Sequence, residues 1–126
     1  MEQVFIELKA FKKDREILLE LEDSEGQKGV QTITTKVKPG DEVIWRLTKD
    51  SNINKILSVK AKKKSINVFS VLPHQVSDEE FRGTIAKDAG GKKEEYDIVY
   101  EYKDGSKVID DPFLDVIPPD DENGDD

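Results

Sequence analysis

Few side chains in this sequence are suited to chemistry, and they lie far apart. His74, between Pro73 and Gln75, is the only histidine, and histidine is the residue type that most readily exchanges protons near neutral pH. A catalytic or metal-binding histidine needs partner groups, and none is identifiable at a motif spacing. We therefore interpret His74 as a loop residue without a catalytic or metal role.

Carboxylates are the second candidate chemistry. Asp110 and Asp111, with Asp115 further on, could offer oxygen ligands to a hard cation such as calcium. Adjacent side chains on a strand point to opposite faces, so the first two make a poor pair. The acidic segment 120–126 does not fit an EF-hand loop, because Pro119 stands where the first aspartate would be. Solvated charge is the expected role, with weak divalent-cation binding as the alternative.

A basic cluster stands out on a chain whose net charge is −8. Its members are Lys55, Lys60, Lys62, Lys63 and Lys64. Such lysines can protect an edge strand from pairing with other chains, or they can contact an acidic partner. The negative net charge and the lack of interleaved aromatic residues argue against nucleic acid as the partner.

Aromatic residues form a row in one strand. Tyr96, Tyr100 and Tyr102 share one face, and with Trp45 they would form either the core or a binding face for a carbohydrate or a protein. We expect the core, with Trp45 buried. If the row is instead exposed, Tyr100 and Tyr102, together with Lys60, Lys62, Lys63 and Lys64, are the candidate partner-binding residues.

The composition bounds the remaining functions. The absence of cysteine excludes disulfides, thiolate nucleophiles and thiolate metal sites. No phosphate-binding loop or catalytic triad is recognisable, so we expect neither an enzyme nor a cofactor. We expect one domain over residues 1–119 and a disordered acidic tail over residues 120–126. No apolar run reaches the roughly 20 residues that span a bilayer, and no export signal is visible, so we expect a cytoplasmic protein.

The elements that would position these residues are short strands. Pro39-Gly40 predicts a type II turn, and the alternation that follows predicts a strand over 43–47 that carries Trp45. The same patterns predict further strands over 4–11, 16–22, 30–37, 57–61, 66–72, 81–85, 96–102 and 106–109. The strand over 66–72 is apolar enough to be covered on both faces.

Three local signals complete the prediction. Ser77 and Glu80 have the spacing of a capping box, which predicts one short helical turn. Asp104-Gly105 predicts a two-residue hairpin turn. Pro112 interrupts the returning strand, so residues 113–117 would form an edge strand or a continuation past a bulge. The whole pattern predicts an all-β Greek-key sandwich of about eight strands.

Three segments resemble the cupredoxin family of β-sandwiches. They are Val37-Lys38-Pro39-Gly40-Asp41-Glu42-Val43-Ile44-Trp45, Phe81-Arg82-Gly83-Thr84-Ile85 and Tyr96-Asp97-Ile98-Val99-Tyr100-Glu101-Tyr102. An immunoglobulin-like or fibronectin-like sandwich is the alternative fold.

The resemblance implies a scaffold without the family's copper chemistry. A blue-copper site needs two imidazoles, a thiolate and usually a thioether, whereas this chain has one histidine, one methionine and no cysteine. We therefore expect a non-catalytic interaction or accessory module with an unidentified protein partner. A carbohydrate-binding sandwich and a weak divalent-cation binder are the alternatives, and a homo-oligomer formed through edge strands remains open.

Overall fold

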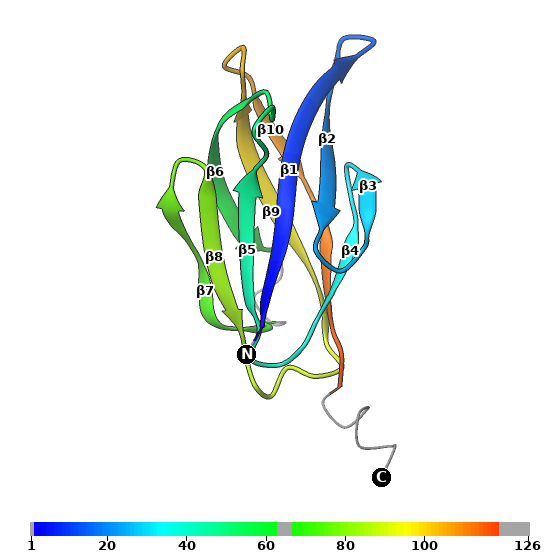
Figure 1. The fold of residues 1–126 in the computed structure, drawn as a ribbon, viewed down its shortest axis with the longest axis vertical. Helices are drawn as coiled ribbons and strands as arrows, with labels where there is room; N and C mark the ends of the chain where they lie inside the picture. The colour runs from blue at the N-terminus through cyan, green and yellow to red at the C-terminus, as the bar shows by residue number, and fades with distance from the viewer. Residues whose placement is uncertain (1, 63–66, 119–126) are drawn as a thin grey trace.

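The protein is an all-β sandwich of two sheets, seen in a computed structural model that describes residues 2–62 and 67–118 (Figure 1). This part of the chain contains eleven strands and no helix. The first sheet has the spatial order β3 (Lys28–Val30), β2 (Glu16–Asp23), β1 (Gln3–Lys13), β5 (Glu42–Leu47), β8 (Glu80–Ile85), β7 (Phe69–Ser77). The second has the order β10 (Lys107–Asp110), β9 (Lys93–Tyr102), β11 (Phe113–Val116), β4 (Thr34–Val37), and β6 (Ile53–Ala61) also pairs with β9.

One hydrophobic core lies between the sheets. Alternate residues of β1 and β9 point into it, and the residues between them face outward. Burying one such aliphatic or aromatic side chain stabilises the fold by about 1.5–3 kcal/mol. The alternation therefore fixes which face of each sheet is inside.

Trp45 of β5 and Tyr96 of β9 join the two sheets at the centre of this core. Both are fully buried, and Trp45 Nε1 donates a hydrogen bond to the Tyr96 hydroxyl at 3.0 Å. Their rings meet edge-on, with centroids 5.6 Å apart, and the ring of Phe69 lies 6.3 Å from that of Trp45. The expectation that Trp45 is buried is confirmed.

The turn before β5 has the predicted geometry. Gly40 has a φ of 88°, and the Asp41 amide donates to the Lys38 carbonyl at 3.0 Å. A positive φ at the third turn position is what a type II turn requires. The buried Asp41 carboxylate also accepts the Lys38 amide at 2.9 Å, which fixes the entry into β5.

The single strand predicted over 30–37 is wrong, because this segment contributes to both sheets. β3 ends at Val30 in the first sheet, and β4 begins at Thr34 in the second. Gln31 has a φ of 72° at the crossing. β-branched residues favour extended structure without showing where a strand changes sheets.

Two predicted turns also differ from the structure. No helical turn follows Ser77, whose hydroxyl accepts the Glu79 amide at 3.1 Å in the tight connection between β7 and β8. The β9–β10 loop has three residues, because the Tyr102 backbone amide donates a hydrogen bond to the Ser106 carbonyl at 2.8 Å. Gly105 in this loop has a φ of 92°. This is the longer hairpin loop with a glycine bulge.

β11 is an interior strand and not an edge. It pairs antiparallel with β9 on one side and parallel with β4 on the other. β10 and β11 both pair with β9, and Pro112 lies between them. Of the two predicted alternatives, continuation past an interruption is the one that the structure has.

Candidate functional site

The tyrosine row belongs to the core. Tyr96 and Tyr100 are fully buried and Tyr102 is 3% exposed. Burial raises the pKa of Tyr96 and Tyr100 above the usual tyrosine value. Tyr100 and Tyr102 are therefore wrong as candidate partner-binding residues, because a ligand could reach them only by opening the sandwich, and the carbohydrate-binding alternative loses its support.

The described lysines of the basic cluster lie on or just beyond β6, facing acidic residues of the same sheet. Lys60 is exposed opposite Asp97 in the β6–β9 register. Lys62 Nζ lies 2.9 Å from Asp97 Oδ1 and 3.9 Å from Asp111 Oδ2, and the hydrogen bond to Asp97 is the main cause of its raised pKa. Lys63 and Lys64 lie outside the described residues. Lys55 lies opposite Glu101 in the same register. Of the described members, Lys62 makes the printed ion pairs, and Lys55 and Lys60 lie across from carboxylates, as lysines at a sheet margin commonly do.

The other candidate groups are not brought together. His74 is exposed on β7, with Nδ1 3.0 Å from the Leu72 carbonyl oxygen. Asp110 is buried, Asp111 is exposed and Asp115 is half-buried on β11. Within residues 2–62 and 67–118, no three His, Asp or Glu side chains gather closely enough to hold a metal ion. The acidic segment 120–126 lies outside the described residues.

Two buried carboxylates are placed against the core and not in a cleft. Asp110 is 8% exposed, and burial, followed by the negative charges of Asp111 and Glu16, raises its pKa to about 7. Glu94 is 1% exposed and its pKa is raised by burial, while its Oε1 accepts the Val68 amide at 3.3 Å. The contact between Glu94 and Val68 holds the segment that enters β7.

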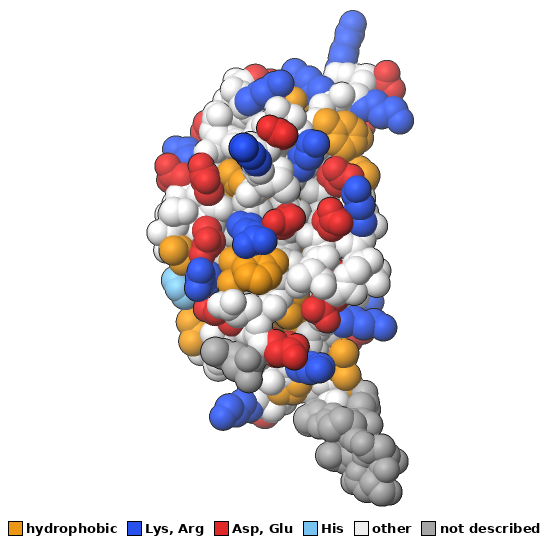
Figure 2. Space-filling model, in the orientation of Figure 1, with side chains coloured by type: hydrophobic (Ala, Val, Ile, Leu, Met, Phe, Trp, Pro, Cys, Tyr) orange, Lys and Arg blue, Asp and Glu red, His pale blue; other side chains and the backbone are white. Residues whose placement is uncertain are grey.

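β7 is the unusual surface of the molecule. Among the described residues, the large hydrophobic side chains that are exposed include three from this one strand: Val71 at 46%, Leu72 at 62% and Val76 at 53%. Figure 2 shows hydrophobic side chains on either side of the histidine at the position of β7 in Figure 1. The prediction that residues 66–72 form a strand covered on both faces is wrong, since only Val68 and Phe69 of its described part are buried.

β7 also differs from the other sheet margins in charge. Lys28 in β3, Lys36 in β4, Lys60 in β6 and Lys107 in β10 each place a cation on an edge strand of the described part of the chain. β7 has no Lys, Arg, Asp or Glu along its nine residues, in a sequence that is 38% charged. Charge on an edge strand discourages contact with other chains, so β7 lacks the protection that the other edges have.

Gly83 of β8 allows the β7 backbone to pack close to β8. A side chain at Gly83 would place its Cβ 3.2 Å from the Val71 carbonyl oxygen and 3.2 Å from the Pro73 nitrogen. The β7 backbone therefore lies close against this position, and a larger residue would push it away by a few tenths of an ångström. The pairing of β7 with β8 shifts register three times, which matches the extra length of β7.

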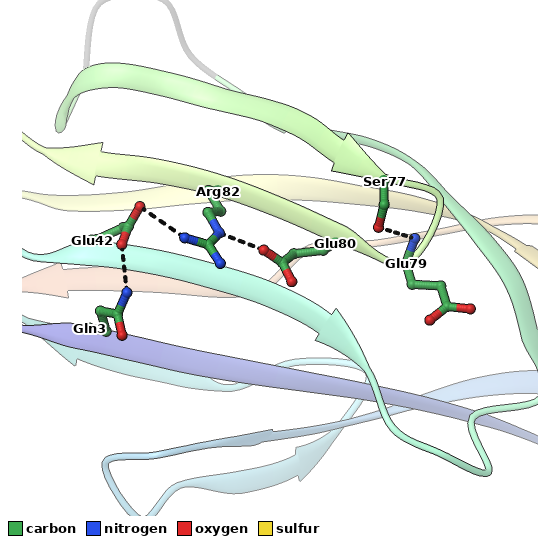
Figure 3. A network of polar contacts seen from close by, with 6 residues as sticks. All are labelled: Gln3, Glu42, Ser77, Glu79, Glu80 and Arg82. Carbon is green, nitrogen blue, oxygen red and sulfur yellow. Dashed lines mark hydrogen bonds and ion pairs between the residues drawn. The ribbon is translucent and has the colours of Figure 1, made fainter.

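The outer face of the first sheet beside β7 carries several ion pairs. Figure 3 shows Arg82 of β8 between Glu42 of β5 and Glu80, with Gln3 of β1 donating to Glu42 at 2.9 Å. The neighbouring Arg46 guanidinium lies 4.1 Å from the Phe5 ring centroid. This face presents charged side chains that pair with one another, in contrast to the apolar β7 edge.

Sequence reasoning missed Val71, Leu72 and Val76 as a surface. A signal was available, because no charged residue occurs between Lys64 and Asp78 in a highly charged chain and Pro73 lies in the middle of that stretch. Proline within a strand marks an edge, where its missing N–H faces away from the sheet. Together these features indicate an exposed apolar edge and not a covered strand.

The fold and the edge define the class of protein as a two-sheet β-sandwich with an uncharged, apolar edge strand. No protein-family model matches the sequence, and a search of curated proteins finds no match. The described residues contain no helix that is long and apolar enough to cross a membrane.

Proposed function

We propose that this protein is a non-catalytic, copper-free cupredoxin-like module that binds protein through its β7 edge. The observation that carries the proposal is the exposure of Val71, Leu72 and Val76 on an edge strand without charged side chains. Interface cores are depleted in charge relative to the rest of a protein surface, and exposed apolar side chains gathered along one uncharged edge are typical of interaction sites.

The positions of the three cupredoxin-like segments support the scaffold part of the proposal. The first segment forms the type II turn and most of β5, the second forms most of β8 beside β5, and the third forms most of β9 in the opposite sheet. Trp45 and Tyr96 connect the first and third segments through the core. The segments that carry the resemblance thus lie at the centre of the sandwich.

The placement of the titratable groups supports the non-catalytic part. His74 contacts a backbone carbonyl and is exposed at an edge. Asp110 and Glu94 are buried against the core, where the groups beside them are the buried Tyr100 hydroxyl and the Val68 amide. A protein-binding role needs only the surface, whereas catalysis would need these groups to converge.

Photo-crosslinking in the cells that make the protein tests the proposal. A photoreactive amino acid at position 72 should give a discrete adduct with a protein, and the same group at the exposed position 22 on β2 serves as the matched control. Adducts at position 72 and not at position 22 support the proposal. No adduct at position 72, or equal adducts at both positions, would refute it.

A further inference from the structure

We infer that Asp110 is a pH-dependent switch for the β10 edge, which stays closed while the Asp110 carboxyl is protonated and opens locally when the carboxyl ionises. The switch lies in the second sheet, whereas the proposed protein-binding edge β7 lies in the first. Three features of the molecule support it: the inward direction of the Asp110 side chain, the acidic groups around it, and the weak attachment of β10.

The Asp110 carboxyl points into the sandwich at the end of β10. In the pairing of β10 with β9, Val108 lies opposite Tyr100 and Asp110 lies opposite Ile98. The burial pattern of β10 places Val108 and Asp110 on the inner face, and Asp110 is 8% exposed. A carboxyl at this position has lost most of its hydration, so ionising it costs free energy.

The side chains that act on this carboxyl are acidic or neutral. Asp111, the next residue, and Glu16, at the start of β2, act on it with their negative charges, and the hydroxyl of the fully buried Tyr100 lies beside it. Two cations are placed toward its acidic neighbours: Lys13 lies opposite Glu16 in the β1–β2 register, and Lys62 Nζ is 3.9 Å from Asp111 Oδ2. No lysine or arginine of the described residues pairs with the carboxyl itself.

The buried Tyr100 hydroxyl is a partner for the protonated carboxyl. Among the described residues, neither this hydroxyl nor Asp110 Oδ2 makes a hydrogen bond of good geometry, although the two groups are close enough to influence each other's pKa. A protonated carboxyl can donate to a hydroxyl and accept from it, whereas an ionised carboxylate can only accept. The hydroxyl favours the ionised form by donating to it, but burial and then the charges of Asp111 and Glu16 outweigh this contribution and raise the pKa of Asp110 to about 7. The closed site therefore favours the protonated form.

β10 is weakly attached to the sandwich. It has four residues and pairs with β9 alone among the described strands. Ile109 is 63% exposed and Val108 is half-buried, so little apolar surface holds the strand in place. Segments of this kind open locally at a lower free energy than the whole protein needs to unfold. Opening moves Asp110 into water, where the ionised form is favoured, so ionisation raises the population of open β10.

Hydrogen–deuterium exchange at about pH 6 and about pH 8, corrected for the intrinsic exchange rate at each pH, tests the switch in the intact chain. In the wild type, the peptide covering residues 106–111 should exchange about tenfold faster at the higher pH, because a carboxyl that titrates near pH 7 is mostly protonated at the lower pH and mostly ionised at the higher. Asp110→Asn cannot ionise at this position and should change less than about twofold. Glu22→Gln is the matched control, since Glu22 is an exposed carboxylate on β2, the strand that carries Glu16. This variant should respond like the wild type.

Glu16→Gln tests the surroundings of the switch. This variant removes one negative charge that acts on Asp110, so the midpoint of the pH dependence should move to lower pH. Circular dichroism confirms that each variant is folded. Exchange in β10 that does not depend on pH in the wild type, an equal pH dependence in Asp110→Asn, or an unmoved midpoint in Glu16→Gln would overturn the inference. Amides of β10 that are as protected as those of β1 would also overturn it, because β10 would then open only when the whole protein unfolds.

Discussion

Tyr96→Phe should destabilise the protein through one buried hydrogen bond. Trp45 Nε1 donates to the Tyr96 hydroxyl at 3.0 Å, and both residues are fully buried. Phenylalanine keeps the ring and its edge-on contact with Trp45, so little apolar area changes. The indole N–H is left buried without this acceptor, and an unsatisfied buried donor costs about 1–3 kcal/mol.

Urea denaturation followed by far-ultraviolet circular dichroism measures this loss as a lower midpoint at an unchanged slope. Tyr102→Phe is the matched control, because it removes a hydroxyl from the same strand without touching the contact between Trp45 and Tyr96. We expect this control to change stability by less than about 0.5 kcal/mol. A loss below about 0.5 kcal/mol in Tyr96→Phe, or an equal loss in Tyr102→Phe, would refute the reasoning.

Three further predictions concern the buried Asp110 carboxyl, the close packing of β7 on Gly83, and a hydrogen bond between the two sheets. The raised pKa of Asp110, about 7, means that the native state holds this proton more tightly than the unfolded chain does. The protonated Asp110 side chain stabilises the fold fully below about pH 4, and this stabilisation is lost as the pH rises through 7. Between pH 4 and 8, the free energy of unfolding of the wild type should therefore fall by about 2 kcal/mol more than that of Asp110→Asn, after allowance for solvent screening. Denaturation experiments at the two pH values measure this difference. Gly83→Val should cost about 1–3 kcal/mol and speed hydrogen exchange in β7, because its Cβ would meet the β7 backbone at 3.2 Å; unchanged thermal unfolding would contradict this. Thr35→Val removes the hydroxyl that donates to Asp23 Oδ2 at 2.7 Å between the sheets, and should cost about 1–3 kcal/mol by urea denaturation; a neutral result would show that the contact contributes nothing.

Much of the fold could be predicted from the sequence, because alternation and turn chemistry are local. The Pro39-Gly40 turn fixes its own dihedrals, and the strand after it reveals Trp45 by a period of two. The break between β3 and β4 could not be predicted in this way. It depends on which sheet each half joins, and the only local mark is the positive φ of Gln31, a residue type that usually avoids this region.

The candidate site was predicted less well, because exposure depends on the order of strands in a sheet. Val71 and Leu72 have the same composition as a covered strand, and only the position of β7 at the end of the first sheet exposes them. The tyrosine row shows the opposite case. An aromatic face can be core or binding surface, and its place between two sheets decides for core.

Hydrogen–deuterium exchange with and without the protein captured by crosslinking from position 72 tests the role of β7 most directly. We expect the peptide covering residues 67–77 to exchange more slowly when that protein is present, while peptides from β3 and β10 do not change. The Leu72→Lys protein should show no such difference. Unchanged exchange in β7, or protection at the β3 or β10 edge instead, would contradict the claim that β7 is the binding surface.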